Sequence, residues 1–370
     1  MLYVFFLNNF LTGGSQTVLY NIASITKKRI LLVPVFQEYN KNLIQKLPQN
    51  VEIFDTGITH KNIIGSFFRL PLIIKRLKQN IKSKGRNYIC INFTDRFLSL
   101  FFTYVIGKKN SITWLHCCPK TLLLSRLKPF YFIMMNKFKE IVFICNSQKE
   151  LFLSHNKTKK INKPMNYVCT NFININAINE IKNEEIEHAK SYFFMAARLD
   201  ESSKDFYTLL KAYSLLPKIT IDRYDLIIAG DGIDRKKIES YINSLDLSEH
   251  VFLIGNVNNP YKWMYNSTIY IHSSKHEGFP MVLIEALACG CNVVSSDCET
   301  GPAEILDYGR CGELYKVGDV DGLREAILKA LSKDEVECKK KSINRASEIN
   351  TKGVNEIYDF FNIHEKELIK

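Results

Sequence analysis

The sequence lacks any uninterrupted apolar run of about 20 residues, the length that a helix needs to cross a bilayer. Its first seven residues include neither a basic leader nor a small-residue cleavage site, so we expect a strand there rather than a signal peptide. None of the 10 cysteines forms a CxxC pair, and their spacing fits neither a disulfide framework nor a usual zinc site. Cys117, Cys118, Cys289 and Cys291 could serve as metal ligands, but small core residues are the simpler interpretation. We therefore expect reduced thiols and a cytoplasmic location.

Size and charge narrow the possibilities further. A chain of 370 residues indicates two domains, each long enough to bury its own core. Hydrophobic residues make up 46% and charged residues 24%, which is typical of a globular protein and excludes a disordered chain. The net charge of +12 indicates anionic partners: nucleic acid, an acidic membrane surface or a nucleoside-diphosphate sugar. Charge alone does not choose among these three.

The most informative stretch runs from residue 268 to residue 290. A β-branched and aromatic run, residues 268–274, predicts a buried strand. Pro280 fits the first turn of a helix, which Gly290 ends. The turn carries Glu277 and the helix carries Glu285, eight residues further on. Because a helix N-terminus offers unpaired N–H groups and partial positive charge, this turn predicts a phosphate site flanked by two carboxylates that accept hydrogen bonds from sugar hydroxyls.

The rest of the chain alternates strands and helices. Residues 2–7, the glycine pair Gly13-Gly14, a helix at 16–25 and a strand at 30–36 form a unit that requires a parallel sheet with a right-handed crossover. Further strands are expected at 88–93, 111–115, 141–147, 192–200, 224–229, 251–254 and 292–295. The pattern predicts an α/β fold with two Rossmann-like domains.

Glu277 and Glu285, separated by seven residues that begin Gly278-Phe279-Pro280, resemble the signature of retaining glycosyltransferases of family 4. The resemblance implies the GT-B fold, in which two Rossmann-like domains with parallel sheets face each other across a cleft. It implies that Glu277 is a catalytic residue that binds the donor sugar and that Glu285 holds the ribose hydroxyls. The simpler alternative is two solvated glutamates on a surface helix. The turn residues implied to bind substrate are Gly278, Phe279, Pro280, Met281 and Val282.

Other strand ends in the second half resemble the same family. Arg198 and Lys204 correspond to two cations that grip the donor diphosphate, although Ala197 stands where the family has glycine. An arginine fork and a lysine ammonium suit phosphate oxygens, and both residues are expected to act in catalysis without a divalent metal. Solvated surface cations are the alternative. The resemblance also places Gly230 in a turn at the substrate, and Gly255 and Asn256 around the nucleotide base.

In the first half the resemblance is thin. It places Gly13 and Gly14 against the donor diphosphate and the acceptor, with Gln16 where the family often has glutamate. It implies that His116, at the end of a predicted strand, points toward the donor sugar and acts as a catalytic residue. A lone histidine is equally well explained as a structural residue.

The predicted boundaries are an acceptor-binding domain at 1–175, a nucleotide-sugar-binding domain at 176–345 and a terminal helix at 346–370 that returns to the first domain. The stretch 141–147 is predicted to be the last strand of the first domain. Residues 156–187, rich in Asn, Lys and Ile without a clear period, are predicted to form the linker.

The prediction is therefore a retaining, metal-independent hexosyltransferase without a cofactor. It would move a hexose or N-acetylhexosamine from a UDP-linked donor to a glycan or lipid-linked acceptor in cell-surface polysaccharide synthesis. A non-catalytic nucleotide-sugar-binding protein stays open as an alternative. A dinucleotide-dependent oxidoreductase is less favoured, because it requires GxGxxG after the first strand. We expect no nucleic acid partner.

Two basic and aromatic stretches, 62–84 and 126–139, are either ordinary surface helices or a face that binds anionic lipid. The second interpretation predicts a peripheral position on the inner face of the plasma membrane.

Overall fold

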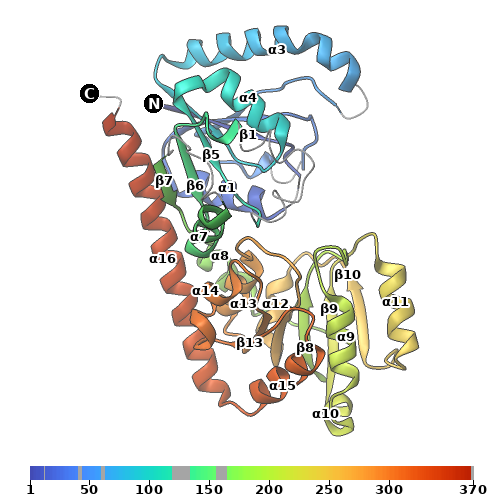
Figure 1. The fold of residues 1–370 in the computed structure, drawn as a ribbon. Helices are drawn as coiled ribbons and strands as arrows, with labels where there is room; N and C mark the ends of the chain where they lie inside the picture. Colours follow the sequence, from blue (N-terminus) through green and yellow to red (C-terminus); the bar gives the residue numbers. More distant parts are fainter. Residues whose placement is uncertain (12, 41–43, 60–62, 119–133, 156–164, 368–370) are drawn as a thin grey trace. The chain divides into compact units, whose positions relative to one another are not determined.

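The computed structural model describes residues 1–370 except 12, 41–43, 60–62, 119–133, 156–164 and 368–370 (Figure 1). The chain divides into two compact units: unit 1 is Met1–Asn171 with Lys352–Lys370, and unit 2 is Phe172–Thr351. Among the described residues, no helix is long and apolar enough to cross a membrane.

Within the described residues, unit 1 has a seven-stranded sheet of order β3-β2-β1-β4-β5-β6-β7, in which every pair is parallel. Its strands are β1 (Leu2–Leu7), β2 (Arg29–Pro34), β3 (Val51–Ile53), β4 (Tyr88–Asn92), β5 (Ser111–Trp114), β6 (Glu140–Phe143) and β7 (Met165–Val168). Its helices include α1 (Gly14–Ile25), α3 (Ile63–Lys84), α4 (Phe97–Gly107) and α7 (Asn146–His155). Every residue of β1 is buried, because helices cover both faces of a parallel sheet and its strands are continuous apolar runs.

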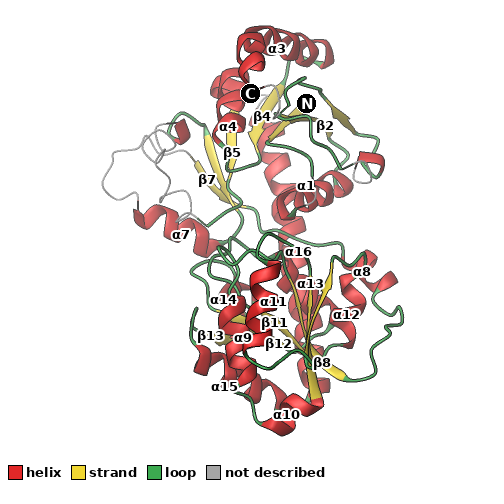
Figure 2. Cartoon of the chain, turned by 90° about the vertical axis from the view of Figure 1, so that its right-hand side faces the viewer, coloured by secondary structure: helices red, strands yellow, loops and turns green. Residues whose placement is uncertain are grey.

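Within the described residues, unit 2 has a six-stranded parallel sheet of order β10-β9-β8-β11-β12-β13. Its strands are β8 (Ser191–Ala196), β9 (Tyr224–Ala229), β10 (Val251–Gly255), β11 (Ile269–His272), β12 (Val293–Ser296) and β13 (Glu313–Tyr315). Its helices are α8 (Ile175–Ile181), α9 (Phe206–Ser214), α10 (Lys218–Arg223), α11 (Arg235–Ser244), α12 (Pro260–Asn266), α13 (Met281–Cys289), α14 (Pro302–Ile305), α15 (Val320–Leu331) and the first part of α16 (Glu335–Glu367) (Figures 1 and 2).

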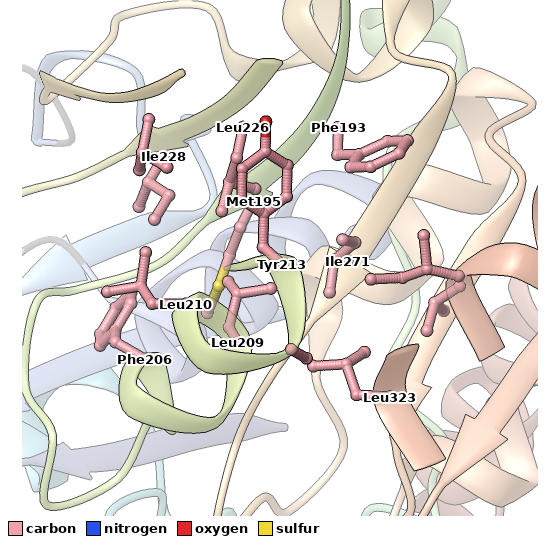
Figure 3. Packing of buried hydrophobic residues seen from close by; sticks show 14 of the residues in the cluster. Phe193, Met195, Phe206, Leu209, Leu210, Tyr213, Leu226, Ile228, Ile271 and Leu323 are labelled. Atoms are coloured by element: carbon pink, nitrogen blue, oxygen red, sulfur yellow. The ribbon is translucent and has the colours of Figure 1, made fainter. Parts of the chain in front are cut away.

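One hydrophobic cluster of unit 2 lies between this sheet and the helices on one of its faces. Figure 3 shows Met195 from β8 and Ile228 from β9 packed against Leu209, Leu210 and Tyr213 from α9. These side chains are fully buried. The rigid packing holds the ends of β8 and β9 in place, and Arg198 and Gly230, which follow these ends, are among the residues predicted to bind substrate.

In each sheet the strand order reverses beside the first strand, between β1 and β4 in unit 1 and between β8 and β11 in unit 2. This is the 3-2-1-4-5-6 order of Rossmann folds, which bind ligands outside the carboxyl ends of the strands at the switch point. The prediction of two Rossmann-like α/β domains with parallel sheets is confirmed.

Two local predictions are wrong. Residues 141–147 were expected to hold the last strand of the first domain, but β7 follows and pairs with β6 from Glu140↔Met165 to Phe143↔Val168. The predicted linker therefore contains a strand, and it also contains helix α8, which Asn174 caps by accepting a hydrogen bond from the Ala177 amide. Neither element has a sequence period clear enough to predict it. β7 has four residues and α8 has seven, and β7 is defined by its pairing with β6.

The last part of α16 is anchored in unit 1 by a buried ion pair. His364 Nε2 lies 2.6 Å from Glu140 Oε2, and both side chains are fully buried. Lys139 Nζ lies 3.2 Å from the other oxygen of Glu140. Burial lowers the pKa of His364, but the hydrogen bond to Glu140 and its charge outweigh burial and raise the pKa above its ordinary value.

This pair predicts a stability that depends on pH. Because the pKa of His364 is higher in the folded than in the unfolded chain, its contribution is complete below about pH 6.5 and is lost as pH rises through the folded pKa. We expect His364→Leu to lower the free energy of unfolding by about 3 kcal/mol at pH 6 and by less at pH 9, measured by urea denaturation. An equal loss at both pH values would contradict the role of the charged histidine.

Candidate functional site

The predicted strand, turn and helix around Glu277 are confirmed. β11 ends at His272, the turn covers residues 273–280, and α13 begins at Met281. Gly290 ends α13 in the left-handed conformation, with φ of 83°, as a helix C-terminus favours. No side chain caps the start of α13, and the Leu283 amide donates to the Pro280 carbonyl at 3.1 Å. The start of an uncapped helix is where an anionic ligand is favoured.

Glu277 and Lys204 form a close ion pair at the carboxyl edge of this sheet. Glu277 Oε1 lies 2.5 Å from Lys204 Nζ, which also donates a hydrogen bond of 3.1 Å to the Ser274 hydroxyl. Burial raises the pKa of Glu277, but the Lys204 charge and the contact with His272 outweigh it, and the pKa is held well below its usual range. Glu277 is therefore a carboxylate at neutral pH, and Lys204 brings positive charge to the switch point between β8 and β11.

His272 is a site residue that the sequence interpretation missed. Its ring is fully buried and its Nε2 lies 3.3 Å from Glu277 Oε1, the same oxygen that Lys204 contacts. Burial lowers the pKa of His272, which favours the neutral ring, although the Glu277 charge opposes this effect. The signal in the sequence was one polar residue at the end of an apolar strand. Because Lys204 and His272 both contact Oε1, they orient the carboxylate and leave Oε2 for another partner.

Arg198 is placed differently from Lys204. Its side chain is 70% exposed, and Nη2 lies 2.9 Å from Asp200 Oδ2. The structure therefore brings one of the two predicted cations to Glu277 and holds the other at Asp200, in the loop that follows β8.

Gly230 and Gly255 lie where three neighbouring strands end. The Gly230 amide donates to the Gly255 carbonyl at 2.7 Å, and the Ala197 amide donates to the Ala229 carbonyl at 2.9 Å. A Cβ on Gly230, at φ of 132°, would lie 1.9 Å from the Ala197 carbonyl oxygen. Glycine is thus required for the loops to pack. Asn256, beside them, is exposed.

A second loop packs against the turn of Gly278, Phe279 and Pro280. The Thr300 hydroxyl donates to the Glu277 carbonyl. A Cβ on Gly301, at φ of 95°, would lie 2.7 Å from Pro280 Cδ and 2.8 Å from the Gly278 carbonyl oxygen. Phe279 is buried, whereas Met281 and Val282 are half-buried at the start of α13. The loop after β12 therefore fixes the backbone of the predicted phosphate turn.

Glu285 lies one turn inside α13, and its Oε1 is 3.5 Å from the Tyr261 hydroxyl of α12. Burial raises the pKa of Glu285 to about 7, against the opposing effect of the Tyr261 hydrogen bond. The simple alternative of two solvated surface glutamates does not fit these two side chains: one is ion-paired and the other has a strongly raised pKa.

In unit 1, His116 follows β5 at the carboxyl edge of the sheet, where it was predicted. Its amide donates to the Asp95 carboxylate at 3.1 Å, and its ring centroid lies 4.2 Å from that of Phe93. Its Nε2 is buried without a hydrogen-bond partner among the described residues, and burial lowers the pKa of His116 to about 3. Asp95, which the sequence interpretation also missed, has a pKa raised to about 6 by burial.

Gly13 and Gly14 lie between β1 and α1. Gly13 is the residue before the helix, and a Cβ on it would meet Gln16 Oε1 at 2.7 Å, whereas a Cβ on Gly14 would meet nothing within 4 Å. Because the Gln16 amide is the mobile end of a flexible side chain, packing against the described residues requires glycine at neither position.

Four cysteines were the possible metal ligands in the sequence. Cys118, Cys289 and Cys291 are buried, as small core residues are, and Cys117 is half-buried. Over the described ranges, no three His, Cys, Asp or Glu residues are grouped as a metal site.

Comparison with known proteins adds three findings. Residues 177–348 match the model of the family "Glycosyl transferases group 1". The chain is 23% identical over 336 residues, 88% of each chain, to the N-acetylgalactosamine-N,N'-diacetylbacillosaminyl-diphospho-undecaprenol 4-alpha-N-acetylgalactosaminyltransferase of Campylobacter jejuni. It is 36% identical over 106 residues to the lipopolysaccharide 1,6-galactosyltransferase of Salmonella typhimurium, which is 28% of this chain and 30% of that relative.

Solved structures show the same fold. HepE of Anabaena in complex with UDP-glucose superposes with a TM-score of 0.77 at 18% identity, over 99% of this chain and 100% of that one. WaaG, a glycosyltransferase involved in lipopolysaccharide biosynthesis, superposes with a TM-score of 0.70 at 15% identity, over 96% and 98%. The likeness confirms the prediction of the GT-B fold, and the family match lies on unit 2, which carries Glu277 and Lys204.

Proposed function

We propose that this protein, whose residues 177–348 match group 1 glycosyl transferases, is a retaining glycosyltransferase that moves a hexose or N-acetylhexosamine from a nucleoside-diphosphate sugar to a glycan or lipid-linked acceptor. The observation that carries the proposal is the ion pair of Lys204 with Glu277 beside the uncapped start of α13. A cation, a run of N–H groups and an oriented carboxylate are what a sugar diphosphate requires. The proposed setting is cytoplasmic synthesis of cell-surface polysaccharide.

In the proposed reaction the acceptor hydroxyl attacks the anomeric carbon on the face that the diphosphate leaves. The bond from the acceptor oxygen to this carbon forms, the bond from carbon to phosphate oxygen breaks, and the hydroxyl proton passes to the departing phosphate. Lys204, Arg198 and the backbone N–H groups of Phe279 and Met281 would stabilise the charge that develops on the diphosphate. Glu277 would accept hydrogen bonds from the sugar through Oε2. The proposal requires no metal or cofactor.

The choice of UDP as carrier rests on similarity. HepE, of the same fold, was solved with UDP-glucose. Gly255 and Asn256 would hold the base through backbone groups.

A donor screen followed by a turnover assay tests the proposal. We expect UDP-linked hexoses or N-acetylhexosamines to raise the melting temperature more than GDP- or ADP-linked sugars do. We also expect release of UDP from the best donor, with retention at the anomeric carbon when an acceptor is present. Binding without any UDP release would identify a non-catalytic nucleotide-sugar-binding protein instead, and no stabilisation by any nucleotide sugar would overturn the proposal.

Glu285 provides a test of nucleotide binding that does not depend on turnover. With a pKa of about 7, the side chain must lose its proton before it can hold the ribose hydroxyls as a carboxylate. UDP affinity, measured by calorimetry, should therefore be about tenfold weaker at pH 6 than at pH 8. Glu285→Gln should bind weakly at both pH values and retain only the smaller change that the phosphates of UDP contribute. The same pH dependence in wild type and variant would exclude this role of Glu285.

A further inference from the structure

The stretch around α3 carries charge of one sign only. Residues 56–94 contain no aspartate or glutamate. Their eight cationic side chains are Lys61, Arg69, Lys75, Arg76, Lys78, Lys82, Lys84 and Arg86. In a protein with 38 acidic residues, a basic segment of this length indicates a surface for an anionic partner.

The outward face of α3 combines this charge with exposed apolar side chains. Phe68 is 86% exposed and Leu72 is 58% exposed. At 3.6 residues per turn, Phe68, Leu72, Lys75 and Lys82 lie along one line of the helix, all of them exposed. The opposite face, Ile73, Leu77 and Ile81, is buried in the core of unit 1. Figures 1 and 2 show α3 at the outer margin of unit 1, with no further element of that unit beyond it.

The charges on this face are not neutralised by the protein itself. Among the described residues, Lys75, Lys78 and Lys82 take part in no ion pair, whereas Lys84 at the end of the helix pairs with Glu52. Exposed apolar residues of unit 2 have different surroundings. Ile219 adjoins the ion pair of Lys218 with Asp222, and Ile233 lies between Asp231 and Asp234.

We infer that the outward face of α3 docks on an anionic lipid bilayer. Phe68 and Leu72 would enter the boundary between headgroups and acyl chains, and the lysines along the helix would face the lipid phosphates. Nucleic acid would use the cations but would gain little from two apolar side chains on a convex helix, so the pairing of exposed apolar groups with unpaired cations favours lipid. The inference goes beyond the proposed function and does not depend on it.

Co-sedimentation of the full chain with vesicles tests the inference. Vesicles of phosphatidylcholine with about a third phosphatidylglycerol should bind the protein at low salt and release most of it at high salt, while vesicles of phosphatidylcholine alone bind it weakly. The triple variant Lys75→Glu, Lys78→Glu, Lys82→Glu should lose at least about a hundredfold in partitioning, since each cation contributes about a fivefold factor. The matched control Lys211→Glu, Lys236→Glu, Lys340→Glu makes the same charge change at exposed lysines of unit 2 that form no ion pair with any described residue. This control should bind nearly as the wild type does.

The apolar part of the surface has its own variant and control. Phe68→Ser with Leu72→Ser should lose about tenfold in partitioning. Ile219→Ser with Ile233→Ser, at residues 78% and 86% exposed, should lose nothing. Unchanged melting temperature and unchanged UDP binding of the α3 variants would show that the donor site is intact, so this test and that of the proposed function fail separately. Equal losses in α3 variants and controls, or equal binding to neutral and anionic vesicles, would overturn the inference, as would preferential binding of a nucleic acid duplex.

Discussion

Lys204→Ala is expected to reduce kcat/KM for sugar transfer by about 10²–10³-fold, the loss that follows removal of one preorganised charge-stabilising group. Lys204 is held 2.5 Å from Glu277 and 3.1 Å from the Ser274 hydroxyl, so its ammonium needs no reorganisation when the diphosphate departs. The variant also removes the charge that keeps the pKa of Glu277 low, and the Glu277 carboxyl would take up a proton more readily. Initial rates of UDP release over a range of donor concentrations separate kcat from KM.

The structure makes this prediction specific to Lys204. Arg198→Ala should cost about tenfold or less, because the Arg198 guanidinium is exposed and paired with Asp200. Lys275→Ala is the matched control: it removes a lysine whose Nζ lies 2.8 Å from Glu201 and leaves Glu277 untouched. We expect near-native kcat for this control. Near-native turnover of Lys204→Ala would exclude its catalytic role, whereas equal losses in Lys204→Ala and Lys275→Ala would indicate a structural effect.

A double-mutant cycle distinguishes stabilisation of the leaving group from orientation of the carboxylate. If Lys204 acts only through Glu277, then adding Lys204→Ala to Glu277→Gln costs nothing further. If Lys204 also binds the diphosphate, adding Lys204→Ala to Glu277→Gln lowers kcat/KM further. We expect a further loss, together with weaker UDP binding in both Lys204 variants.

Gly230→Ala is expected to destabilise unit 2 by about 3 kcal/mol or more, the range of strained or overpacked core substitutions. The added methyl group would lie 1.9 Å from the Ala197 carbonyl oxygen, and backbone cannot rotate away as a side chain does. The shift would separate the ends of β8 and β9 and displace the loops that carry Arg198 and Gly255. Urea denaturation and UDP affinity should therefore both be affected.

Gly318→Ala isolates the contribution of the backbone conformation. Gly318 has φ of 78°, but a Cβ there would meet nothing within 4 Å. Gly318→Ala should therefore lower the free energy of unfolding only by the penalty of a left-handed conformation, about 1 kcal/mol, and should leave UDP binding unchanged. Equal stability of the two variants would show that close packing at Gly230 is not what requires glycine.

Much of the fold was predictable because its signals are local. The strands expected at 2–7 and 224–229 coincide with β1 and β9, since continuous apolar runs bounded by turn residues define buried parallel strands. The helix after Glu277 was bounded by Pro280 and Gly290, whose backbone preferences are their own. β3, β7 and β13 were not predicted, because their sequences, Val-Glu-Ile, Met-Asn-Tyr-Val and Glu-Leu-Tyr, each include a polar residue and form no continuous apolar run.

The sequence by itself determined the α/β class, the succession of long strands and helices, and the presence of carboxylates, cations and glycines at strand ends. Only the tertiary structure decided which of them meet. Lys204 pairs with Glu277 across 73 residues of chain, the His272 ring contacts the same carboxylate, and Arg198 pairs with Asp200 instead. The physical reason is that local propensity acts within a few residues, whereas the register between β8 and β11 depends on the packing of the entire sheet.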